Sequence, residues 1–93
     1  MTIGLLTAAI HIPESRSLKA KRRVLRSLKD RIRARFNVAV AELEDHNQWQ
    51  SSLLGIVSIG RDKRRLNGLL SKILDLIVQT RDIQLLDHKI ELG

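Results

Sequence analysis

The chain is organised around the segment SLKAKRRVLRSLKDRIRARF, residues Ser17–Phe36. Five apolar residues recur in it at steps of seven, three, four and four, and these are Leu18, Leu25, Leu28, Ile32 and Phe36. This spacing places them on one side of a helix with 3.6 residues per turn. The segment therefore predicts an amphipathic helix whose apolar side packs against the core.

The same segment carries most of the positive charge. From Arg16 to Arg35 there are ten Lys or Arg and one acid, Asp30, which gives a local balance of +9. The whole chain has a formal net charge of +7, so the other residues together sum to −2. No Lys or Arg occurs between Asn37 and Gly60. The cations are therefore segregated on one predicted helix.

Most of these cations fall opposite the apolar side at about 100° per residue. Such a stripe stays in water or meets an anion, and binding to a nucleic-acid backbone requires several cations within reach of successive phosphates. We therefore predict a nucleic-acid-binding site, and its candidate residues are Lys19, Lys21, Arg22, Arg23, Arg26 and Arg33. The alternative is a solvated face that keeps the protein soluble.

Lys21 needs a separate explanation, because it lies on the apolar side of the wheel near Leu28 and Ile32. Its stem can lie on the core while the ammonium reaches solvent or pairs with a sheet acid such as Glu42. Alternatively, Lys21 marks an anion site at the start of the helix, where free amides point outward.

The composition predicts one folded domain spanning residues 1–93. Hydrophobic residues make up 43% and charged residues 29% of the chain, as in folded proteins. The absence of Cys excludes a disulfide framework, a thiol nucleophile and a thiolate metal site. No positively charged leader precedes the first apolar run, and no run approaches the ~20 apolar residues of a membrane span. We expect a cytoplasmic protein with no membrane partner.

The remaining patterns predict four strands and a second helix. The strands are expected at Thr2–Ile12, Val38–Asp45, Ser52–Gly60 and Ile83–Leu92, and the helix follows the cap residue Asp62 and runs to about Gln79. The order βαββαβ is the split βαβ repeat. With right-handed crossovers it predicts an α+β ferredoxin-like plait, a four-stranded antiparallel sheet with two helices on one face.

Local features refine this fold. Asn37 is a plausible left-handed stop for the first helix. Gly55 in the third strand suggests a bulge or close packing, and a change of apolar parity near Leu85 predicts a bulge in the last strand. The first strand is apolar on both faces. The uncovered sheet face therefore predicts self-association or another protein contact.

The chain contains two motifs, SLKAKR at 17–22 and FNVAVAE at 36–42, and these are followed by the W-Q and L-G of NQWQSSLLGIVSI. In these motifs the chain resembles the YlxP-like family of small bacterial proteins of unknown function. The resemblance covers Ile3 to about Ile77. It implies a ferredoxin-like fold, a bacterial cytoplasmic origin and genes often found beside those of translation-initiation and ribosome-binding factors. The matching positions are Ser17, Leu18, Lys19, Lys21, Arg22, Phe36, Asn37, Val40, Glu42, Trp49, Gln50 and Gly55. Ala20 and the stretch Glu44–Gln48 depart from the family pattern.

Other candidate sites are few. Trp49, in a polar link, is a candidate partner contact, and the alternative is packing against the end of the sheet. The three His residues are far apart in sequence, so we expect no metal, with His46 beside Asp45 and Glu44 as a minor alternative. No Ser-His-Asp arrangement, Gly-rich phosphate loop or paired-carboxylate motif appears, although scattered acids can meet in space. We expect no enzyme, no cofactor and no small-molecule substrate.

The sequence thus favours a non-catalytic RNA- or ribosome-associated binding protein that uses the first helix as a phosphate-contacting stripe. One Phe, one Trp and no Tyr provide little aromatic surface for base stacking on an open sheet. The backbone of a structured RNA is therefore the expected partner. The alternative is a homo-oligomeric or adaptor module that uses the open sheet face. Both hold together if a homodimer presents two basic helices.

Overall fold

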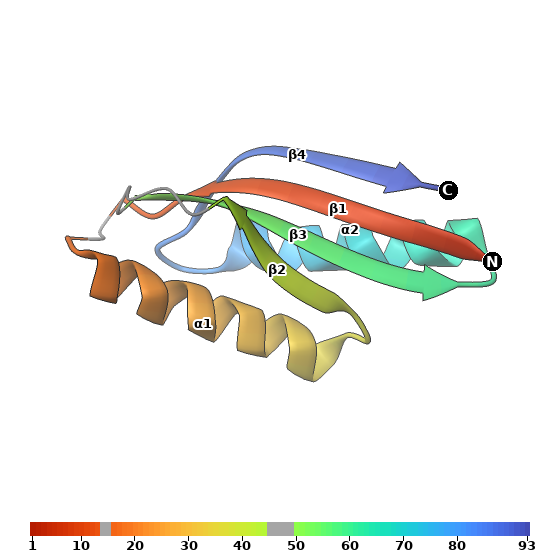
Figure 1. The fold of residues 1–93 in the computed structure, drawn as a ribbon, viewed down its shortest axis with the longest axis horizontal. Helices are drawn as coiled ribbons and strands as arrows, with labels where there is room; N and C mark the ends of the chain where they lie inside the picture. Colours follow the sequence, from red (N-terminus) through yellow and green to blue (C-terminus); the bar gives the residue numbers. More distant parts are fainter. Residues whose placement is uncertain (14–15, 45–49) are drawn as a thin grey trace.

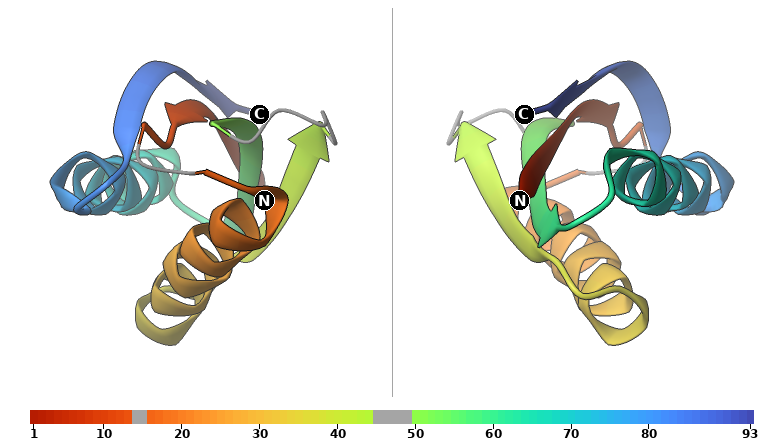
Figure 2. Two further views of the ribbon diagram at one scale, coloured as in Figure 1. Left: turned by 90° about the vertical axis from the view of Figure 1, so that its left-hand side faces the viewer. Right: turned by 90° about the vertical axis from the view of Figure 1, so that its right-hand side faces the viewer.

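The computed structural model describes residues 1–13, 16–44 and 50–93 (Figure 1). Its elements, in chain order, are β1 (Thr2–His11), α1 (Leu18–Arg35), β2 (Ala39–Glu44), β3 (Ser51–Gly60), α2 (Lys63–Gln79) and β4 (Gln84–Leu92). The strands form one antiparallel sheet in the order β2-β3-β1-β4. Both helices lie on one face of the sheet, α1 under its β2 side and α2 under its β4 side (Figure 2). The predicted ferredoxin-like α+β fold is confirmed.

The core lies between the sheet and the two helices. In β1 every second side chain is buried, among them Leu6, Ala8 and Ile10, because successive residues of a strand point to opposite faces. The helices cover these residues with their apolar stripes. The buried helical residues with apolar side chains are Leu25, Leu28, Ile32, Leu66, Leu70, Ile73, Leu76 and Ile77. Phe36, expected on the same stripe, is only partly buried and packs against the edge of this core.

Both helices begin where the sequence predicts. The Ser17 hydroxyl accepts a hydrogen bond from the Ala20 amide at 3.1 Å, and the Asp62 carboxylate accepts one from the Arg64 amide at 3.0 Å. The predicted left-handed stop at Asn37 is wrong. The chain passes from α1 through an extended Phe36, φ −135°, directly into β2. Among the described non-glycine residues only Asp82, between α2 and β4, has a positive φ, of 69°.

The predicted irregularities of the sheet are present. The pairing of β1 with β4 shifts between Ala9 and Ile10 and leaves Leu86 out of register, so the bulge near Leu85 is confirmed. A second shift in β2 leaves Leu43 out of register and lays its side chain over Gly55. A Cβ at Gly55 would lie 2.9 Å from Leu43 Cδ1, so this glycine serves close packing.

Gly4 allows α2 to approach the sheet closely. A Cβ at this position would lie 2.9 Å from Leu70 Cδ1 and 3.0 Å from Leu66 Cδ2, and both leucines are buried. Gly68, on the exposed side of α2, has nothing within 4 Å of such a Cβ.

We therefore predict opposite effects of one substitution at two sites. Gly4→Ala should lower the free energy of unfolding by about 1–3 kcal/mol, because the added methyl overpacks a filled core. Gly68→Ala should raise it by about 0.5–1 kcal/mol, because alanine has the higher helix propensity. Urea denaturation of both variants measures the two changes. A Gly4→Ala variant as stable as the original chain would contradict this account of the helix–sheet packing.

Candidate nucleic-acid interface

Four of the predicted phosphate contacts form one exposed group at the start of α1. We call Lys19, Arg22, Arg23 and Arg26 the basic cluster. All four side chains are exposed, because the apolar stripe on the other side of the helix faces the core. None of them forms an ion pair or side-chain hydrogen bond with another residue in the described ranges. They occupy two turns of helix, about 10 Å at 1.5 Å per residue.

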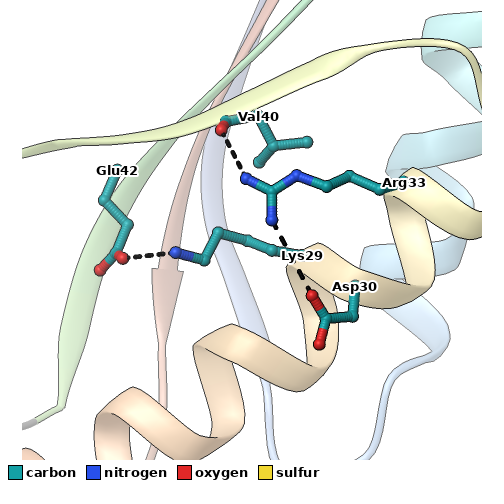
Figure 3. Close-up of polar contacts among 5 residues, drawn as sticks. All are labelled: Lys29, Asp30, Arg33, Val40 and Glu42. Atoms are coloured by element: carbon teal, nitrogen blue, oxygen red, sulfur yellow. Dashed lines mark hydrogen bonds and ion pairs between the residues drawn. The ribbon is translucent and has the colours of Figure 1, made fainter.

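Arg33 lies apart from this cluster because it ties α1 to the edge strand (Figure 3). Its Nη2 atom donates a hydrogen bond to the Val40 carbonyl oxygen at 3.1 Å. Its Nη1 atom lies 3.9 Å from Asp30 Oδ1, one helical turn away. The guanidinium thus has partners within the protein. Arg33 is predicted as a phosphate contact, but its geometry gives it a part in holding β2 against α1.

Lys29 makes a second tether to β2. Its Nζ atom lies 2.7 Å from Glu42 Oε2, and the Lys29 side chain is only 20% exposed (Figure 3). On the other flank of the helix, Arg31 Nη1 donates to Thr80 Oγ1 at 3.5 Å, at the end of α2. The side of α1 near the sheet is therefore held by its own polar contacts. The basic cluster lies outside them.

Lys21 is not part of the exposed surface. Its residue is 5% exposed, and it takes part in a polar or electrostatic interaction within the protein. Leu25 and Leu28 are buried on the same side of the helix, as the position of Lys21 on the wheel predicts. Its place among the phosphate contacts stays a prediction.

Acidic residues of β2 border the cluster on the side of the sheet. Arg22, Arg26 and Lys29 line a hollow between α1 and β2, and Glu42 and Glu44 line it from the strand. The two carboxylates lower the positive potential in this hollow. Lys19 and Arg23 are not among its lining residues, so the strongest positive potential is expected on the outer side of the helix.

The remaining candidate sites are the partner contact at Trp49 and the metal alternative at His46. Trp49, His46 and Asp45 lie outside the described residues, so the partner contact at Trp49 and the minor metal alternative stay predictions. Among the residues that the structure describes, no three His, Cys, Asp or Glu side chains lie close enough to hold a metal ion. No helix in the described ranges is both long and apolar enough to cross a membrane.

Comparison with known proteins places the chain in a family. A family model described as "Protein of unknown function (DUF503)" matches residues 3–90. The chain belongs to the DUF503 family. The "Uncharacterized protein YlxP" of Bacillus subtilis (strain 168) is 28% identical to this DUF503 chain over 82 residues, which cover 88% of the chain and 89% of that protein. The resemblance noted from the two motifs is confirmed.

We predict that Glu42 weakens anion binding at the basic cluster. Glu42→Gln removes one of the two carboxylates of the hollow and frees the ammonium of Lys29 from its ion pair. Affinity for heparin, a sequence-independent polyanion, should rise about two- to fivefold, as expected for about 0.5–1 kcal/mol. Titration calorimetry at fixed salt measures this change.

Glu91→Gln is the matched control, because it removes one carboxylate from β4 at the far edge of the sheet. Its heparin affinity should change less than that of Glu42→Gln. Equal gains in the two variants would mean that net charge, and not the position of Glu42 beside the cluster, sets the affinity.

Proposed function

We propose that this DUF503 chain is a non-catalytic cytoplasmic protein that binds the phosphate backbone of structured RNA through its basic cluster. The observation that supports the proposal is the exposure of Lys19, Arg22, Arg23 and Arg26 without a carboxylate partner among the described residues. The gene neighbourhood that the family resemblance implies makes ribosomal RNA the first ligand to test.

The position of the cluster has an energetic cost that an anion would offset. Arg22 and Arg26 are four residues apart, and like charges at this spacing repel by a few tenths of a kcal/mol. The cluster also occupies the first half of α1, near the positive end of the helix dipole, where cations are unfavourable. Phosphate groups beside the cluster would add attractive interactions that offset both costs. A run of about 10 Å brings these cations within reach of successive phosphates of one strand.

The scarcity of aromatic side chains favours a duplex over a single strand. Proteins that read single-stranded RNA on an open sheet stack its bases on aromatic residues. Phe36 packs against the core, with the Arg35 guanidinium 5.8 Å from the centre of its ring. Duplex RNA is recognised mainly by shape and through its phosphates and 2′-hydroxyls. The cations of α1 suit this second mode.

We predict that neutralising the cluster removes about three phosphate contacts. The variant Lys19→Gln, Arg22→Gln, Arg26→Gln should bind duplex RNA more weakly. The slope of log affinity against log salt concentration should be smaller in magnitude by about three. Binding releases about one counterion from the RNA for each cation that contacts a phosphate, and this variant has three fewer such cations. Fluorescence anisotropy of a labelled duplex over a salt series measures both values.

The control is Lys63→Gln, Arg64→Gln, Arg65→Gln, which removes the same residue types from the first turn of α2. In Figure 1 the starts of α1 and α2 lie at opposite ends of the molecule. This control should keep most of the salt dependence. The proposal fails if the original chain does not bind duplex RNA at low salt, or if the two triple variants lose affinity equally.

A further inference from the structure

The sheet face opposite the helices carries an apolar surface on three neighbouring strands. We call it the open face, and we define it by the apolar and small residues of β1, β3 and β2 that point away from the helices: Ile3, Leu5, Thr7, Ala9, Leu53, Gly55, Val57, Ile59, Ala39, Ala41 and Leu43. The pair His11 and Ser51 lies at one end of the same face. Within the described ranges no element covers this face (Figure 2). Ile3 is 47%, Val57 38% and Ile59 62% exposed. Together with Leu43 they make four large exposed apolar side chains on one face. On an ordinary protein surface such side chains occur singly and scattered.

Charged residues border this face along β4. The pairing register sets Asp87 opposite Ala9, Lys89 opposite Thr7 and Glu91 opposite Leu5, so all three lie on the open face. Lys89 and Glu91 pair with each other at 3.7 Å. An apolar centre with a polar border is the usual anatomy of a protein–protein interface. Because β4 is charged, the apolar area is limited to β2, β3 and β1, and β3 is the middle strand of these three.

We propose that the open face binds a second copy of the same chain, sheet against sheet, about a two-fold axis that lies between the two sheets and runs parallel to β3. In this arrangement β3 packs on its symmetry mate and β1 packs on β2 of the partner. The charged strand β4 stays at the rim in contact with water. The inference is independent of RNA binding, because it uses none of the residues of the basic cluster.

The distribution of charge favours pairing of two copies through this face, because it keeps their basic helices apart. Each chain has a formal net charge of +7, so two copies that meet through their helices would bring their cations together. Packing through the open face leaves the helices on the two outer sides. With layers about 10 Å apart, the two basic clusters lie about 30 Å from each other, well beyond a Debye length of about 8 Å. Repulsion between the copies is then small.

The size of the face is sufficient for a reversible dimer. The three strands β1, β3 and β2 have 10, 10 and 6 residues, and at about 4.8 Å between strands and about 3.3 Å per residue they cover about 14 Å by 30 Å on average. Each copy therefore offers a flat area of about 400 Å². Its solvent-accessible surface is larger, because the side chains project from the sheet. Two copies bury about 1,000 Å², the lower end of specific interfaces. We expect an association that depends on concentration. None of the described residues of the face is aromatic, so bases of a single strand are a poor alternative occupant.

Sedimentation velocity between about 5 and 500 μM tests this inference, a range that brackets the micromolar affinity expected of a small interface. The original chain should pass from monomer to dimer as its concentration rises. Val57→Glu should raise the dissociation constant at least tenfold, because two carboxylates would be buried near the two-fold axis. Val78→Glu, the same change on an exposed position of α2, should leave the association unchanged.

Ile59→Glu provides a second variant, because Ile59 is 62% exposed and its replacement leaves the core intact. Circular dichroism checks the folding of both variants. Three results would overturn the proposal. The first is an original chain that stays monomeric at the highest concentration, which would mean a different occupant or none. The second is association that survives in both open-face variants. The third is association that Val78→Glu abolishes.

Discussion

Burial of the apolar stripe of α1 determines where every cation of this helix lies. Leu25, Leu28 and Ile32 are almost wholly enclosed between the helix and the sheet. Rotating the helix to bring its cations toward the sheet would expose these three side chains, at about 1.5–3 kcal/mol for each. The orientation is therefore fixed. Lys29 and Arg33 find partners on β2, and Arg31 finds one at the end of α2. Within the described ranges, the cations of the basic cluster, on the outer side, have only solvent or a ligand to neutralise them.

The first strand imposes a second constraint, because it is apolar on both faces and runs through the middle of the sheet. One face receives the two helices and forms the core. The other has no described cover, and its apolar residues continue onto β2 and β3 (Figure 2). The protein thus has a cationic outer side and an opposite side that is apolar on β1, β2 and β3 and charged along β4. The two sides suit different partners, an anionic polymer and a second copy of the chain.

The sequence predicts the features that depend on local periodicity. The order of elements, the two faces of β1 and the irregularity near Leu85 all follow from residue spacing, and the cap at Asp62 follows from its residue type. Features that require the position of a distant strand are not predictable in this way. The tether from Arg33 to Val40 exists only because β2 passes beside the end of α1.

The surroundings of Asn37 and Lys21 depend on the position of the sheet and do not follow from the periodicity of the helix. Asn37 fails as a stop because the extended path into β2 leaves no room for a left-handed residue. Lys21 could be placed on the apolar side of the helix from sequence, but not the degree to which its neighbours enclose it. Both outcomes depend on where the sheet lies relative to α1, which helical periodicity does not encode.

The most direct test of the account is to map where RNA touches the protein. Amide chemical shifts of the ¹⁵N-labelled chain would be followed by NMR during titration with a duplex RNA of about 16 base pairs, the length that double-stranded RNA-binding domains span. We predict that the shifts change along Leu18–Arg26 and stay constant on the open-face residues of β1 and β3. Changes concentrated on β1 and β3, with α1 unaffected, would contradict the assignment of phosphate binding to the basic cluster.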